Sequence, residues 1–115
     1  MLRLWKAFLS TCDGLRWAMR NEVAIRQELI VLAVAVPLSF LVADVALWRI
    51  ALIGSPTILV IVELLNTAIE KLADHVAPER SAAIKIVKDL GSAAVFLALV
   101  IAGMIWLVAL IAKVA

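Results

Sequence analysis

Four polar side chains recur at helical spacing in an otherwise apolar stretch, residues 60–74. They are separated by three, four and four residues, and they are Glu63, Asn66, Glu70 and Asp74. At about 100° per residue, an α-helix places all four within roughly 80° of one another, on one stripe. Ionised carboxylates are costly in hydrocarbon, so such a stripe requires a counter-charge, a metal ion or water. We therefore take it as the candidate functional site.

The residue types of this stripe suit Mg²⁺ and phosphate. Carboxylates dominate it, and the chain has a single cysteine, Cys12, and a single histidine, His75. Mg²⁺ prefers oxygen ligands and is commonly held by one or two carboxylates together with phosphate oxygens and water. This pattern favours nucleotide binding and phosphoryl transfer. The sequence contains neither a GxxxxGK[ST] loop nor a GxGxxG motif, so any nucleotide site must be built on helices.

Two positions have the character expected of reacting or phosphate-binding groups. Glu63 is the deepest carboxylate of the stripe and has the position expected of a general base; the alternative is a buried acid bonded to a neighbouring helix. Lys88 begins a second cluster, Lys88-Asp89-Leu90-Gly91-Ser92, and can meet a phosphate where Gly91 allows close approach. Composition alone favours an ordinary interfacial rim for this cluster, in which lysine extends to the headgroups.

The composition predicts that lipid surrounds the chain. Of its 115 residues 66% are apolar, and its mean hydropathy is +1.13. A soluble domain of this size cannot bury so much apolar surface. The net charge of +2 gives no indication of a nucleic-acid partner. The single cysteine excludes an internal disulfide and a cysteine-based metal site.

The positions of the apolar runs predict an all-α membrane protein with three spans. Residues 1–20 have apolar residues on one side and basic residues on the other, which suits a helix on the membrane surface or one packed on the rest of the protein. About 20 apolar residues are needed for each span. We expect a single membrane domain, 1–115, with these parts: surface helix and polar collar 1–28, first span 29–48, second span 50–73, cytoplasmic connection 76–92 and third span 93–112.

Local features refine this arrangement. Glu22 and Arg26 are four residues apart and can pair on a helix, or they can form a solvated start of the first span. Gly54-Ser55-Pro56 marks an irregularity near the start of the second span, and residues 81–90 are expected to form a helix that continues into the third span without a break.

The distribution of Lys and Arg predicts the orientation. Residues 1–28 carry five, residues 71–88 carry four, and the first connection carries Arg49. The N-terminus and the second connection are therefore expected on the cytoplasmic side, with Glu70 and Asp74 near that surface and Glu63 deeper.

The segments VELLNTAIEKLAD (62–74), KDLGSAAV (88–95), NEVAIRQE (21–28) and Gly14-Leu15-Arg16 together resemble the small prokaryotic diacylglycerol kinase family. The resemblance covers roughly the whole chain in order and spacing. It implies an integral inner-membrane enzyme with three spans and an N-terminal surface helix, working as a homotrimer. It also implies a reaction in which ATP and 1,2-diacylglycerol give ADP and phosphatidate, with Mg²⁺ as the cofactor.

The resemblance further implies a role for each matching residue. Glu63 resembles the family's catalytic base, and Glu22 and Glu70 resemble the carboxylates that hold the Mg²⁺ of the nucleotide. The residues expected to contact ATP are Arg3, Ser10, Glu22, Glu70, Lys88 and Asp89. The residues expected near the lipid substrate are Arg26, Gln27, Glu28, Glu63 and Ser92, with Asn66 and Asp74 supporting the site. The stretch Glu79-Arg80-Ser81 falls where the family's loop covers the nucleotide, although its sequence departs from the family pattern.

Three other functions fit part of the pattern. Relatives within the family phosphorylate undecaprenol with the same motifs, and this sequence does not distinguish between lipid tails. A small proton- or ion-conducting oligomer would need Glu63 but neither Lys88-Asp89 nor Mg²⁺, since intramembrane carboxylates often mark ion paths. A structural subunit would tolerate amide replacement throughout the stripe. We expect the kinase, acting on diacylglycerol.

Overall fold

The computed structural model of this chain describes residues 1–79 and 81–115. Within them it has α1 (Leu2–Asn21), α2 (Val23–Val42), α3 (Ala46–Val76) and α4 (Ala82–Val114). Arg80, part of the stretch that the resemblance assigns to a loop over the nucleotide, lies outside the described residues. The expected all-α class is confirmed.

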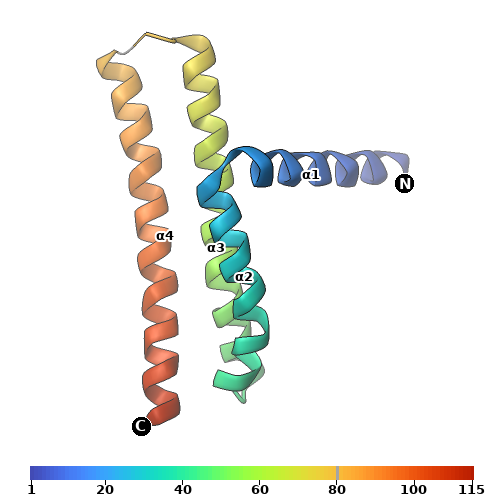
Figure 1. Cartoon of the computed structure of the whole chain (residues 1–115), viewed down its shortest axis with the longest axis vertical. Coiled ribbons are helices and arrows are strands. Elements are labelled where there is room, and N and C mark those ends of the chain that lie inside the picture. Colours follow the sequence, from blue (N-terminus) through green and yellow to red (C-terminus); the bar gives the residue numbers. More distant parts are fainter. Residues whose placement is uncertain (80) are drawn as a thin grey trace.

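Three of the helices run alongside one another, and the first projects away from them (Figure 1). Helix α3 is the centre of the arrangement, because it packs against both α2 and α4. The three helices from α2 to α4 are each long and apolar enough to cross a membrane. Their outward faces carry large exposed apolar side chains, such as Leu41, Ile50 and Leu107, and lipid is the solvent that such faces require. The chain is a multi-pass membrane protein.

Helix α1 presents its apolar residues to the outside rather than to the bundle. The rings of Trp5 and Phe8 stack on each other with centroids 5.8 Å apart, and both side chains are more than half exposed. Ala18, near the end of α1, is its buried residue. The surface-helix expectation therefore fits this arrangement better than packing of α1 on its own chain.

The first span differs from its predicted limits. Helix α2 begins at Val23 and ends at Val42, and Trp48 belongs to α3. Twenty residues of helix already cover about 30 Å, so the span needs no extension to Trp48. The predicted pairing of Glu22 with Arg26 is wrong, because the extended backbone of Glu22 separates α1 from α2. Arg26 instead donates from Nη1 to the carbonyl oxygen of Met19 at 2.9 Å.

Helix α4 begins earlier than the apolar run that it contains, as the sequence predicted. Its N-cap is Ser81, whose Oγ accepts a hydrogen bond from the backbone N–H of Ile84 at 3.2 Å. A serine hydroxyl at this position satisfies an N–H that has no partner within the helix. The helix then continues without a break to Val114.

Helix α3 runs straight through the expected irregularity at Gly54-Ser55-Pro56, and a side chain of α4 explains how. Pro56 has no N–H, so the carbonyl of Leu52, four residues earlier, lacks its usual helical donor. The indole Nε1 of Trp106 donates to that carbonyl oxygen at 2.9 Å. Leu52 is fully buried, so this bond satisfies a group that water cannot reach. Trp106 thus supplies the hydrogen-bond donor that Pro56 lacks, and the same bond links α4 to α3.

The hydrogen bond from Trp106 predicts that Trp106→Phe destabilises the fold by about 1 kcal/mol, because the substitution leaves the Leu52 carbonyl without a donor. The measurement is the free energy of unfolding in a detergent titration. Pro56→Ala supplies the missing N–H, so in a Pro56→Ala background the same substitution should cost clearly less. Equal costs in both backgrounds would show that the hydrogen bond does not compensate for the proline.

Candidate functional site

The polar stripe on α3 is organised by one amide. Nδ2 of Asn66 donates to Oε2 of Glu63 at 3.3 Å and to Oε1 of Glu70 at 2.9 Å. Glu63 and Asn66 are each only 9% exposed. The predicted placement of these residues on one helical face is confirmed, and the amide fixes the orientation of the carboxylates on either side of it.

Gly91 on α4 allows the two helices to meet at this amide. A β-carbon added at Gly91 would collide with Oδ1 of Asn66, whereas one added at Gly103 would meet nothing within contact distance. Oδ1 of Asn66 is buried and finds no hydrogen-bond donor within the described part of the chain. The close approach at Gly91 is therefore one of helix to helix, made to the residue that holds Glu63 and Glu70, and the approach of a phosphate there stays a prediction.

Glu28 reaches the stripe from α2. Its carboxyl group lies near that of Glu63, and its buried Oε1 has no hydrogen-bond partner within the described part of the chain. Because α2 and α3 are antiparallel, Glu28 meets Glu63, while Glu22 meets a residue two turns further along α3. The site therefore takes side chains from α2, α3 and α4.

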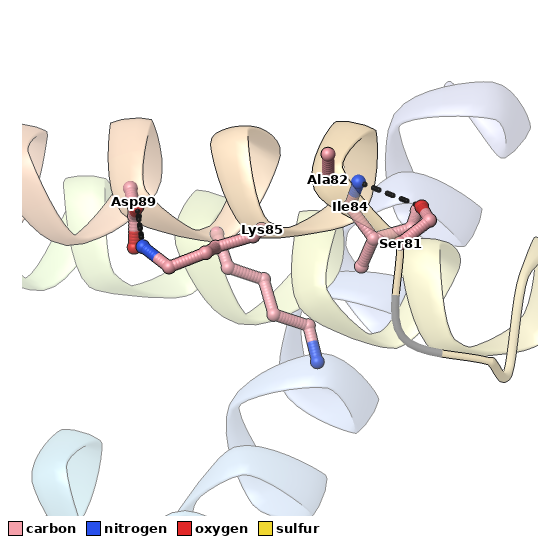
Figure 2. Close-up of a pocket in the computed structure, with 6 residues that line it drawn as sticks. Ser81, Ala82, Ile84, Lys85 and Asp89 are labelled. Carbon is pink, nitrogen blue, oxygen red and sulfur yellow. Dashed lines mark hydrogen bonds and ion pairs between the residues drawn. The ribbon is translucent and has the colours of Figure 1, made fainter.

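Two lysines occupy the beginning of α4. Lys88 Nζ donates to Oδ1 of Asp74 at 2.8 Å and so links α4 to the end of the stripe on α3. Lys85 Nζ donates to Oδ2 of Asp89 at 2.6 Å, one turn along the same helix. The two lysines border a hollow of about 460 Å³, and Figure 2 shows the residues that line it: Ser81, Ala82, Ile84, Lys85, Lys88 and Asp89.

A third lysine connects the junction of α1 and α2 to α3. Lys71 Nζ lies 3.5 Å from Oε1 of Glu22. The same Nζ lies 5.7 Å from the centre of the Trp17 ring, over its face. Lys71 directly follows Glu70, so Glu22 and Glu70 lie at neighbouring positions along the bundle.

The other residues expected at the site lie on its margin or away from it. Arg26, Gln27 and Ser92 are exposed, the first two on α2 and the last beside Gly91 on α4. Arg3 and Ser10 lie on α1, which leads away from the bundle (Figure 1). At 1.5 Å per residue, Arg3 is about 28 Å along α1 from Glu22.

The residues present fit Mg²⁺ only as an open site. Within residues 1–79 and 81–115, no three His, Cys, Asp or Glu side chains are grouped as metal ligands. Glu22 and Glu70 alone are too few for a closed site. Two carboxylates nevertheless match what Mg²⁺ takes from a protein when phosphate oxygens and water complete its coordination.

Two residues with a place at the site were not identified from the sequence. They are Trp17 and Lys71; the pairing of a third, Lys85, with Asp89 was likewise not predicted. The spacing of Lys85 and Asp89, four residues on a helix, is a local signal that could have revealed their pairing. No local signal links Lys71 to Glu22, which is 49 residues away in the sequence.

Comparison with known proteins places the chain in a family. A family model described as prokaryotic diacylglycerol kinase matches residues 10–110. A diacylglycerol kinase of Pseudomonas aeruginosa is 43% identical over 94 residues, which are 81% of this chain and 76% of that protein. One of Escherichia coli K12 is 38% identical over 108 residues, 94% of this chain and 88% of that protein. One of Haemophilus influenzae is 38% identical over 94 residues, 82% of this chain and 80% of that protein. Because the family model covers most of the chain and these relatives are 38–43% identical to it, the chain belongs to the prokaryotic diacylglycerol kinase family.

Proposed function

We propose that the protein transfers the γ-phosphate of ATP to the hydroxyl of 1,2-diacylglycerol and releases ADP and phosphatidate. It is an ATP-dependent diacylglycerol kinase that works within the membrane. One observation carries the residue assignments. Glu63 is a buried carboxylate that meets α2 through Glu28 and connects through Asn66 to Glu70, toward the lysine-lined end of the bundle.

Glu63 acts as the general base in this proposal. A lipid hydroxyl that reaches Glu63 from between the spans can transfer its proton to the carboxylate as its oxygen attacks the γ-phosphate. Asn66 holds that carboxylate in one orientation through its Nδ2. Glu28 lies beside Glu63, and we assign it to the lipid headgroup together with Arg26 and Gln27, which precede it on α2, and Ser92, which follows Gly91 on α4.

Lys88 and Asp89 bind the nucleotide. An ammonium group has three donors, so Lys88 can keep its bond to Asp74 and still donate to a phosphate oxygen. Asp74 therefore orients Lys88. Glu22 and Glu70 would hold the Mg²⁺ that accompanies ATP, and the bound ion would offset the negative charge of the phosphate oxygens.

A homotrimer accounts for the residues that one chain leaves apart. Arg3 and Ser10 lie far along a helix that leaves the bundle, so we assign their contacts with ATP to the site of a neighbouring copy. Association would also cover part of the exposed apolar surface of α3, where Ile58, Leu65 and Leu72 are exposed at seven-residue intervals. We place the N-terminus and the α3–α4 connection on the cytoplasmic side of the inner membrane, because Lys and Arg are concentrated there.

Removal of the base should abolish turnover and leave the nucleotide site intact. Glu63→Gln keeps the size of the side chain and an oxygen that can accept from Asn66, but it cannot take the proton. We expect phosphate transfer to fall by at least about 100-fold, with little change in the affinity for a non-hydrolysable ATP analogue. Near-normal turnover would show that Glu63 is not the base.

The packing of Gly91 on Asn66 predicts an unequal effect of two glycine substitutions on α4. Gly91→Ala displaces the Asn66 amide and so misplaces Glu63 and Glu70; we expect activity to fall by about 10- to 100-fold. Gly103→Ala adds the same methyl group to the same helix where nothing is in contact range. We expect it to retain activity, and equal losses in both variants would argue against the positioning role of Asn66.

The substrate is tested by phosphate transfer from γ-labelled ATP in mixed micelles, with diacylglycerol and undecaprenol offered separately. We expect labelled phosphatidate, and removal of Mg²⁺ with a chelator should stop its formation. Labelled undecaprenyl phosphate alone would keep the mechanism and change the substrate. Failure of transfer to either lipid by a folded oligomer would favour ion conduction, which proton flux into vesicles would test.

A further inference from the structure

Lys71 links α3 to the junction of α1 and α2, and it has no role in the mechanism described so far. It stands on α3, and its partners Glu22 and Trp17 belong to the junction of α1 and α2 and to the last turns of α1. Glu22 is one of the two carboxylates assigned to Mg²⁺, and Glu70, the other, directly precedes Lys71. The ammonium group of Lys71 thus forms an ion pair with Glu22, a proposed ligand of the metal.

We propose that Lys71 exchanges one anion for another during the reaction. Without metal it is the counter-ion of Glu22, and with the metal–nucleotide complex bound it becomes a contact for the nucleotide phosphates. This inference rests on the proposed function, because it takes Glu22 and Glu70 as the carboxylates that hold Mg²⁺.

The first half of the exchange follows from charge. Glu22 is about three-quarters buried at its side chain, and Lys71 is the cation that accompanies it. A divalent cation bound by the same carboxylate repels the ammonium group and takes over its role as counter-charge. Lys71 therefore opposes binding of the metal alone.

The second half follows from position. Lys71 follows Glu70 and touches Glu22, so phosphate oxygens that share a cation with these two carboxylates lie beside its Nζ. The Nζ of Lys71 lies over the face of the Trp17 ring, and an ammonium group is attracted to an aromatic face. A lysine side chain is a flexible point charge with three donors, so it can change partners without a change of the backbone.

The exchange predicts effects of opposite sign on two affinities. Lys71→Met removes the charge and keeps a long apolar stem on Trp17. Affinity for Mn²⁺ alone, used in place of Mg²⁺, should rise by about 1.5- to fivefold, because an exposed ion pair of this kind no longer competes. Affinity for the Mn²⁺ complex of a β,γ-methylene analogue of ATP should fall by a similar factor.

The experiment uses the full chain in mixed micelles and measures free Mn²⁺ by electron paramagnetic resonance, first without and then with the nucleotide analogue. Lys113→Met, at the other end of the bundle, removes the same charge and should change neither affinity. Lys71→Arg keeps the charge and should stay closer to the wild type than Lys71→Met in both measurements. Circular dichroism and oligomer size check that each variant is folded.

The outcomes separate this inference from the proposed function. If Lys71→Met weakens both affinities, Lys71 only holds α1 in place; if it strengthens both or changes neither, Lys71 does not contact phosphate. Either result overturns the exchange while leaving the kinase assignment standing. If the wild type itself binds no Mn²⁺ with the analogue present, the assignment of Glu22 and Glu70 to the metal falls, and the exchange falls with it.

Discussion

The bridge from Asn66 to Glu63 and Glu70 is the interaction on which the rest of the site depends. Two carboxylates and an amide on a membrane helix are expensive unless they bind one another or a partner. Here the amide nitrogen of Asn66 donates to both carboxylates, and the amide oxygen of the same side chain faces Gly91 on α4. The same contact therefore sets the distance between α3 and α4 and the orientation of the proposed base.

The two ends of the bundle satisfy their polar groups by different means. At the end near the α2–α3 connection, one indole N–H compensates for a proline, and small residues such as Ala102 and Ala109 let the helices pack closely. At the other end, lysines pair with carboxylates across helices or along one of them. Exposed pairs of this kind contribute little to stability. Such pairs can change partners at little cost, which suits the nucleotide site that we propose at this end.

Much of this protein was predictable because a small number of strict rules govern the sequences of membrane helices. The lengths of the apolar runs fixed three spans, and the continuation of α4 into its polar beginning followed from its helical periodicity. The stripe of Glu63, Asn66 and Glu70 followed from spacing alone. The pairing of Glu22 with Arg26 failed because periodicity does not reveal the extended residue at the α1–α2 break, and the end of the first span was misplaced because Trp48 was taken as its boundary.

By itself the sequence determined the helices, the face that carries the carboxylates and, through its motifs, the family. Those properties are local, since they depend on residues three to seven positions apart. Only the tertiary structure decided that Trp106 completes the backbone of α3, that Gly91 meets Asn66 and that Lys71 stands on Glu22. These contacts join residues 25 to 54 positions apart, and their existence depends on which faces of the helices meet in space.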